Sequence, residues 1–114
     1  MRAPTLKRGE LWTVKLPGGR GSVQRGVRPA LVIQNDVGNE YSSTTIVAAV
    51  TSTIKIYPMT VVLEKGEGAL TRRSMVNLSQ IFTVDKEALN HRIGTLSAER
   101  MEAVNRAIRV SLDV

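Results

Sequence analysis

Five short strand-like segments, separated by turns, constrain the fold of this chain most. They are rich in aliphatic and β-branched residues, and the segment 44–52 is apolar throughout its centre, which indicates a strand covered on both faces. Several short strands at this spacing predict a small β-barrel or sandwich. The predicted strands are residues 9–16, 28–34, 44–52, 59–64 and 74–84, and we expect the last and longest to bend.

The hydrophobic pattern changes its period near the C-terminus, where residues 97–112 have the spacing of an amphipathic helix. Ser97 is placed to cap its start and Glu99 lies in its first turn, where the helix dipole favours a negative charge. We also expect a short helix after Asp85, capped by that residue, and a turn or helical turn over 35–39. The residues predicted to share the apolar face of the long helix are Met101, Val104, Ala107, Ile108 and Leu112.

The fold class is therefore mainly β with a C-terminal helix (α+β). The length of 114 residues predicts a single domain over 1–114, and the 42% hydrophobic content is that of a globular chain. No apolar run approaches the ~20 residues that span a membrane, and no signal peptide is visible. We therefore expect a cytoplasmic protein with no membrane contact.

The charge indicates an anionic partner. The net charge is +6, the isoelectric point is about 10.3, and most of the cations are arginines. A guanidinium matches phosphate or carboxylate oxygens in two-point contacts. A basic domain of this kind is typical of proteins that bind nucleic acid, an acidic protein, or both.

Several kinds of active site cannot be built from this composition. There is no cysteine, and His91 is the single histidine, so a metal cluster of histidines or cysteines is not possible. The glycine-rich stretch at 18–22 lacks the Gly-Lys-Ser/Thr ending of a nucleotide-binding loop. We expect no cofactor and no metal ion, and we interpret His91 as structural or exposed.

Arg28 is the remaining candidate for chemistry, because it stands where a glycine-rich cationic loop enters a core strand. It either caps the strand and pairs with an acid, or it is held rigidly at the mouth of a ligand site. Thr51 ends the third predicted strand. If the second and third strands pair antiparallel, Arg28 and Thr51 face the same cleft.

The sequence blocks resemble, in order, those of the MazF/PemK/Kid toxins of bacterial toxin–antitoxin pairs. The blocks are "RGELWTVKL", "GSVQRGVRPALVIQND", "TTIVAAVTS", "SMVNLSQIFTVDK" and "RIGTLS", and the resemblance extends from about residue 7 to 112. It implies an SH3-like β-barrel, a homodimer, and a sequence-specific, metal-independent endoribonuclease that cleaves mRNA. It also implies an acidic, partly disordered antitoxin that folds over the RNA groove and competes with RNA.

The resemblance also implies roles for individual residues. Arg28 and Thr51 match the catalytic arginine and threonine of the family. The loop from Arg20 to Val27 carries base contacts, and Pro58 lies in a segment that flanks the RNA groove. The residues implied in RNA binding are Arg20, Gly21, Ser22, Gln24, Arg25, Tyr57 and Gln80.

The implied chemistry needs neither a histidine nor a metal, because RNA carries its own nucleophile. Attack of the 2′-OH on the adjacent phosphorus leaves a 2′,3′-cyclic phosphate and a free 5′-OH. Arg28 would stabilise the phosphorane charge, and Thr51 would hydrogen-bond the same phosphate. An arginine is a poor general base, so we expect a flat pH–rate profile between about pH 6 and 8, whereas a titration near 6.5 would indicate His91.

This chain departs from its relatives near the expected RNA groove. Val23 replaces an acid and Arg25 a small residue, while Ser79 and Phe82 stand where relatives often have Glu and Arg. Two alternatives therefore stay open. One is a catalytically weak module that binds RNA and antitoxin. The other is a gyrase poison like the CcdB toxins, which depend on a C-terminal tryptophan, whereas the single tryptophan here is Trp12.

Overall fold

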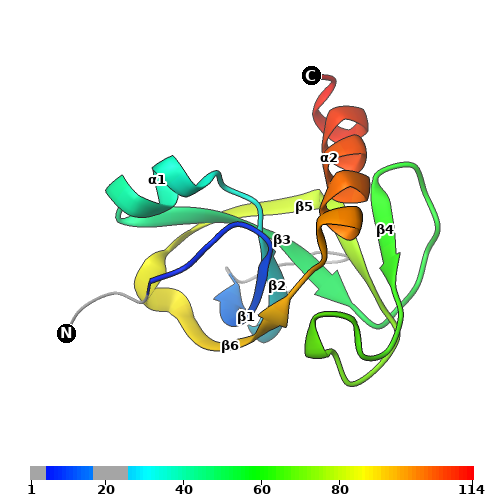
Figure 1. Cartoon of the computed structure of the whole chain (residues 1–114), viewed down its shortest axis with the longest axis horizontal. Coiled ribbons are helices and arrows are strands. Elements are labelled where there is room, and N and C mark those ends of the chain that lie inside the picture. Colours follow the sequence, from blue (N-terminus) through cyan, green and yellow to red (C-terminus); the bar gives the residue numbers. More distant parts are fainter. Residues whose placement is uncertain (1–4, 17–25) are drawn as a thin grey trace.

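The computed structural model describes residues 5–16 and 26–114, which form one six-stranded antiparallel sheet with a long C-terminal helix (Figure 1). The strand order is β4-β5-β3-β2-β1-β6. The strands are β1 (Glu10–Leu16), β2 (Gly26–Val32), β3 (Thr44–Thr51), β4 (Thr60–Leu63), β5 (Ser74–Asp85) and β6 (Leu89–Thr95). The helices are α1 (Asp36–Tyr41), α2 (Ala98–Leu112) and the short 3₁₀ turns η1 (Glu67–Ala69) and η2 (Lys86–Ala88).

All five predicted strands are confirmed, but the sequence prediction missed β6. This strand lies at the edge of the sheet beside β1, and its residues Asn90, His91 and Arg92 are exposed. Such a polar edge strand lacks the apolar alternation that marks a buried one. Strand β2 also begins earlier than predicted, at Gly26, because Val27 pairs with Lys15 of β1.

The expected bend in β5 is present as an irregularity in its pairing with β3. Ala49 pairs with Asn77, whereas the neighbouring Ala48 pairs with Ile81. Inside the interrupted stretch, the Asn77 side-chain oxygen accepts hydrogen bonds from the Ser79 backbone N–H at 3.0 Å and hydroxyl at 2.6 Å. The extra residues bend the strand and increase the curl of the sheet.

The curled sheet encloses two hydrophobic clusters. The first lies between the sheet and α2, and the second is built on the other sheet face. Successive residues of β2 alternate between the clusters, as the two-residue period of a strand requires. The first contains Leu11, Leu31, Ala48, Val50, Val61, Leu63, Leu70, Val76, Leu78, Leu96, Val104 and Ala107. The second contains Leu6, Trp12, Val14, Leu16, Ala30, Val32, Val47, Ala49, Val84 and Leu89.

Helix α2 begins as predicted, because the Ser97 hydroxyl accepts a hydrogen bond from the Arg100 N–H at 3.2 Å. Val104 and Ala107 are buried against the sheet, whereas Leu112, predicted for the same apolar face, is 55% exposed. The last turn of α2 still contacts the sheet on one side, because the Ser111 hydroxyl donates to the Leu78 carbonyl oxygen of β5 at 2.6 Å, and the C-terminus of the helix then extends outward (Figure 1).

The two shorter helical predictions are confirmed in position. The turn at 35–39 is the start of α1, whose first turn is capped when the Asn35 side chain accepts from the Gly38 N–H at 2.8 Å. A 3₁₀ turn follows Asp85, but the Asp85 side chain makes no capping hydrogen bond, contrary to expectation. Among the described residues, no helix is long and apolar enough to cross a membrane.

Strands β4 and β6 form the two edges of the sheet. Within the described part of the chain these two strands do not pair with each other, so the sheet is not closed into a barrel. Instead, η1, which follows β4, lies against β6. The approach is close: a Cβ added at Gly94 would lie 2.2 Å from the Gly68 carbonyl oxygen. A glycine is therefore needed at position 94, where η1 contacts the edge strand β6.

Candidate functional site

Strands β2 and β3 pair antiparallel, which is the arrangement that brings Arg28 and Thr51 together. Ala30 pairs with Ala49, and the same register runs on to Val32 and Val47. Arg28 lies two residues before Ala30, and Thr51 lies two residues after Ala49. Both side chains therefore stand at the same end of neighbouring strands and, by alternation, on the same face of the sheet.

The surroundings of Arg28 and Thr51 hold their backbones in place. Arg28 is exposed, but its Cα partner on β1 is the fully buried Val14. Thr51 is half-buried and pairs with Met75 of β5. Its hydroxyl oxygen accepts a hydrogen bond from the Thr53 N–H at 3.1 Å, which leaves the hydroxyl proton able to bond a ligand oxygen.

The loop from β3 to β4 folds back over the start of β5. The Lys55 N–H lies 3.2 Å from the sulfur of Met75, the strand partner of Thr51. The Thr60 hydroxyl accepts from the Tyr57 N–H at 2.9 Å and lies 3.0 Å from the Lys55 carbonyl oxygen. These bonds fix the loop beside the end of β3, with the side chain of Tyr57 56% exposed and Pro58 also exposed.

Gln80 lies in the interrupted stretch of β5, half-buried and next to β3. The structure therefore places Gln80, Thr51 and Arg28 on three adjacent strands, in the order β5, β3, β2.

Sequence reasoning missed Asn77 as a candidate site residue. It is the strand partner of Ala49 and shares the sheet face of Thr51. The signal was available, because Asn77 is a polar residue between the apolar Val76 and Leu78.

The remaining predicted residues are only partly placed by the structure. Phe82 packs partly buried against the second cluster, opposite Val47 on β3. Because Val47 and Thr51 are four residues apart on β3, Phe82 lies on the same sheet face as Thr51. The predicted residues of the glycine-rich loop lie outside the described part of the chain; these are Arg20, Gly21, Ser22, Val23, Gln24 and Arg25.

His91 is exposed, as predicted, and it lies away from the face of Arg28. It pairs with Thr13 of β1, and Thr13 pairs in turn with Pro29 of β2. Direct cross-strand partners share a face, so His91 and Arg28 stand on opposite faces of the sheet.

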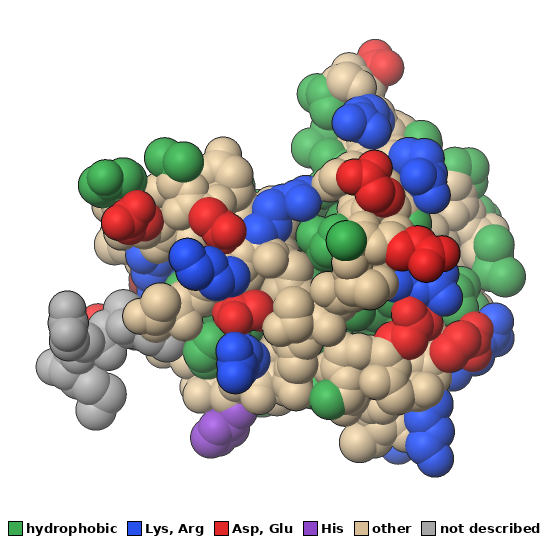
Figure 2. Space-filling model, in the orientation of Figure 1, with side chains coloured by type: hydrophobic (Ala, Val, Ile, Leu, Met, Phe, Trp, Pro, Cys, Tyr) green, Lys and Arg blue, Asp and Glu red, His purple; other side chains and the backbone are tan. Residues whose placement is uncertain are grey.

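Near the start of α2, one arginine is paired with an acid of η1. Arg100 makes two hydrogen bonds to the Glu67 carboxylate, at 2.7 and 3.0 Å, and these bonds lower the pKa of Glu67. On the face shown in Figure 2, acidic and basic side chains lie side by side near this helix. No group of three or more His, Asp and Glu side chains within residues 5–16 and 26–114 could hold a metal ion.

Two cavities are lined entirely by described residues, and neither Arg28 nor Thr51 is among those residues. One of about 400 Å³ is lined by Lys15, Leu16, Thr44, Thr83, Val84, Asp85 and Ala88. Another of about 320 Å³ is lined by Thr5, Leu6, Lys7, Asp36, Asn39, Glu40 and Lys86.

The chain is similar to known proteins in both sequence and fold. The chain is 44% identical over 110 residues to the endoribonuclease MazF of Staphylococcus saprophyticus, which covers 94% of this chain and 91% of that protein. Its fold matches an endoribonuclease from a mycobacterial species in complex with its cognate antitoxin, with a TM-score of 0.81, 22% identity and 96% of each chain covered. MazF from Deinococcus radiodurans also gives a TM-score of 0.81 at 22% identity, over 97% of this chain and 99% of that one.

The model of the PemK-like, MazF-like toxins matches residues 7–112, which is nearly the whole chain. The chain therefore belongs to the family of PemK-like, MazF-like toxins of type II toxin–antitoxin systems.

Proposed function

We propose that this protein is a sequence-specific endoribonuclease that cleaves single-stranded mRNA and so inhibits translation and growth. The observation that carries the proposal is the placement of Arg28 and Thr51 at the same end of β2 and β3, on one sheet face. The 44% identity to an endoribonuclease MazF supports the same activity.

The proposed reaction uses the RNA 2′-OH as the nucleophile. The 2′-OH gives its proton to water, the 2′-oxygen bonds to the adjacent phosphorus, and the bond from phosphorus to the 5′-oxygen breaks. The leaving 5′-oxygen takes up a proton, so the products are a 2′,3′-cyclic phosphate and a free 5′-OH. Arg28 donates two hydrogen bonds to the phosphoryl oxygens as negative charge develops on them. The Thr51 hydroxyl donates to the same phosphate and holds it in line for attack. No metal ion or cofactor enters this scheme.

Recognition of the RNA sequence is proposed to come from residues around this pair. Tyr57 presents an exposed ring for base stacking, and Gln80 offers an amide that reads base edges. Loop residues preceding Arg28 complete the proposed RNA-binding set, namely Arg20, Gly21, Ser22, Gln24 and Arg25.

The proposed biological context is that of a toxin controlled by a partner. We propose one domain with the SH3-like barrel architecture, acting as a cytoplasmic homodimer. An acidic antitoxin would bind the same basic surface and compete with RNA, as suits a chain of net charge +6. A related fold has been solved in complex with its cognate antitoxin, which supports a partner of this kind.

The direct test incubates the purified protein with a long mRNA in the presence of EDTA and maps the new 5′ ends. We expect discrete cuts with 5′-OH ends that disappear in Arg28→Ala. Arg109→Ala is the matched control, since it removes an exposed arginine from α2 and should leave the cuts unchanged.

Cuts that require added metal, or that persist in Arg28→Ala, would contradict the proposed mechanism. Intact binding of RNA without cleavage would instead favour a binding module. In that case Ser79 would be the first residue to substitute, because its hydroxyl donates a hydrogen bond to the Asn77 side chain in the interrupted stretch of β5.

A further inference from the structure

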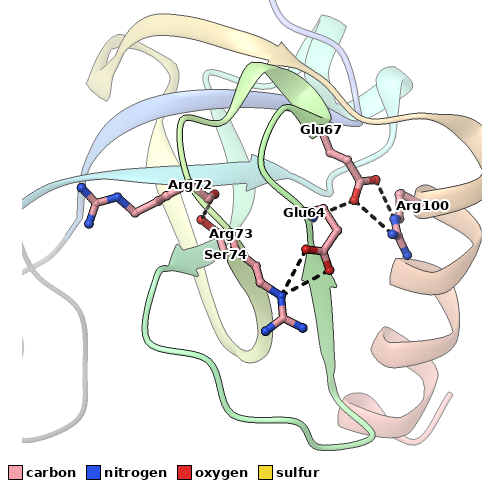
Figure 3. Close-up of polar contacts among 6 residues, drawn as sticks. All are labelled: Glu64, Glu67, Arg72, Arg73, Ser74 and Arg100. Carbon is pink, nitrogen blue, oxygen red and sulfur yellow. Dashed lines mark hydrogen bonds and ion pairs between the residues drawn. The ribbon is translucent and has the colours of Figure 1, made fainter.

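Three arginines surround the turn between β4 and β5, and two of them are neutralised by neighbouring acids. Arg73 forms an ion pair with Glu64 at 3.2 Å, and Arg100 forms a bidentate pair with Glu67 (Figure 3). The same two acids are linked, because the Glu64 N–H donates to the Glu67 carboxylate at 2.7 Å.

Arg72 is the third arginine, and its side chain stands apart from this network. Its carbonyl oxygen accepts from the Ser74 hydroxyl at 3.0 Å, while within the described residues its guanidinium has neither a hydrogen bond nor an ion pair. The side chain is exposed and extends away from both ion pairs (Figure 3). Residues 68–84 contain no Asp or Glu, so the local sequence offers it no carboxylate.

The position of Arg72 relates it to the proposed site. It precedes Met75 by three residues, a span of at most about 10 Å, and Met75 is the strand partner of Thr51. Neighbouring strands lie about 5 Å apart, so Arg72, Thr51 and Arg28 occupy the same end of three adjacent strands. Lys55 also lies there, since its N–H contacts the sulfur of Met75.

We infer that Arg72 binds a backbone phosphate of the RNA, next to the phosphate that Arg28 holds. This inference rests on the proposed ribonuclease function and extends it along the substrate. An unneutralised, exposed guanidinium beside the site contributes affinity for phosphates without reading the base sequence. Arg72 would therefore position the strand, and its loss would raise KM and leave kcat nearly unchanged.

The test compares Arg72→Ala with Arg73→Ala, which removes the same charge from the adjacent residue. The probe is a single-stranded RNA containing one mapped cut, with a 2′-deoxy nucleotide at that cut so that it binds without cleavage. We expect Arg72→Ala to bind about fivefold more weakly at low salt. The slope of log K against log salt should fall by about 0.7, as expected for one lost phosphate contact on a single strand.

Arg73→Ala should change this slope much less, because Glu64 already neutralises that guanidinium. Arg72→Lys should have a slope of log K against log salt close to that of the parent protein, since it keeps the positive charge. Replacing single phosphates by methylphosphonates should then reveal one position near the cut that weakens binding to the parent protein but not to Arg72→Ala. Thermal unfolding of each variant checks the fold, with Arg72→Gln as a second neutral variant.

If the parent protein cuts RNA but Arg72→Ala and Arg73→Ala have equal salt slopes, the inference about Arg72 is wrong. The proposed ribonuclease function would not be affected by that result. Arg72→Ala that weakens binding of an acidic peptide but not of RNA would also overturn it and assign the residue to a protein contact. A parent protein that neither binds nor cuts RNA would overturn the proposed function as well.

Discussion

At the scale of single residues, the site depends on side chains whose backbones are held by the core. Arg28 extends from a strand that becomes fully buried two residues later, at Ala30. Thr51 is the last residue of a strand whose preceding four residues are buried. A guanidinium and a hydroxyl on such rigid positions are suited to stabilising charge that develops at a fixed point in space.

Thr51→Ala should lower kcat by about 100-fold, the effect typical of removing one hydrogen-bond donor from a developing anion. Thr51→Ser keeps the hydroxyl and should retain most of the activity. Thr53→Ala is the control, because Thr53 contacts Thr51 through its backbone N–H and not through its side chain. Initial rates on an RNA with one mapped cut measure the effect, and equal rates for Thr51→Ala and Thr53→Ala would remove Thr51 from the mechanism.

His91→Gln should leave the cleavage rate and its pH dependence unchanged between about pH 6 and 8. The reason is geometric, since His91 stands on the opposite sheet face from Arg28. The measurement is kcat/KM against pH for both proteins. A titration near pH 6.5 that disappears in His91→Gln would show that the imidazole takes part in proton transfer.

At the scale of elements, an ion pair joins the first turn of α2 to η1. The Arg100 hydrogen bonds are the largest cause of the lowered pKa of Glu67, and the Glu64 N–H adds to the effect. The same contact raises the pKa of Arg100. The pair therefore connects the helix to the turn that leads into β5, where Arg72 stands.

Glu67→Gln should destabilise the protein by about 1 kcal/mol at pH 7. Because the pKa of Glu67 is lower in the folded chain than its ordinary value of 4.5, its contribution is complete above that value and is lost as pH falls through the lower folded pKa. The difference between parent and variant should therefore shrink below about pH 4.5. Urea unfolding at pH 7 and pH 3 measures it.

The matched control for Glu67→Gln is Glu102→Gln, an exposed acid of α2 with no ion pair among the described residues. It should change stability little at either pH. A stability difference for Glu67→Gln that stays constant from pH 7 to pH 3 would contradict the ion-pair explanation.

At the scale of the whole molecule, curling of the sheet brings its two ends together. The interrupted pairing of β5 bends the sheet, and the turn η1 then meets β6 at Gly94. This long-range contact between η1 and β6 covers one side of the first hydrophobic cluster. That cluster includes Leu11 from β1 and Leu96 after β6.

Gly94→Ala should lower the free energy of unfolding by about 1–3 kcal/mol, the usual effect of forcing a group into filled space. The new Cβ would lie 2.2 Å from a backbone oxygen, which cannot move aside like the end of a side chain. Each kcal/mol should lower Tm by about 4–8 °C in a domain of this size. Calorimetry measures it, with Thr95→Ala, an exposed neighbour, as the control that should change Tm less.

Local sequence patterns were sufficient for five strands, the capped C-terminal helix and the candidates Arg28 and Thr51, because period and capping depend on residues close in the chain. They were insufficient for β6, whose polar residues form a strand only because β1 offers an open edge. They were also insufficient for the inward turn of Phe82, the exposure of Leu112 and the place of Asn77 beside Thr51, which depend on register and on where the sheet ends.

The separation of Arg72 from Arg73 illustrates the same limit most clearly. In the sequence they are adjacent, equivalent cations. In the fold Arg73 is paired with Glu64, which follows β4, whereas Arg72 has no ion pair among the described residues. Charge and local pattern thus determine that the chain is a basic β protein with a terminal helix. Which charges remain available to a ligand is decided only by the tertiary structure, because pairing joins residues that are distant along the chain.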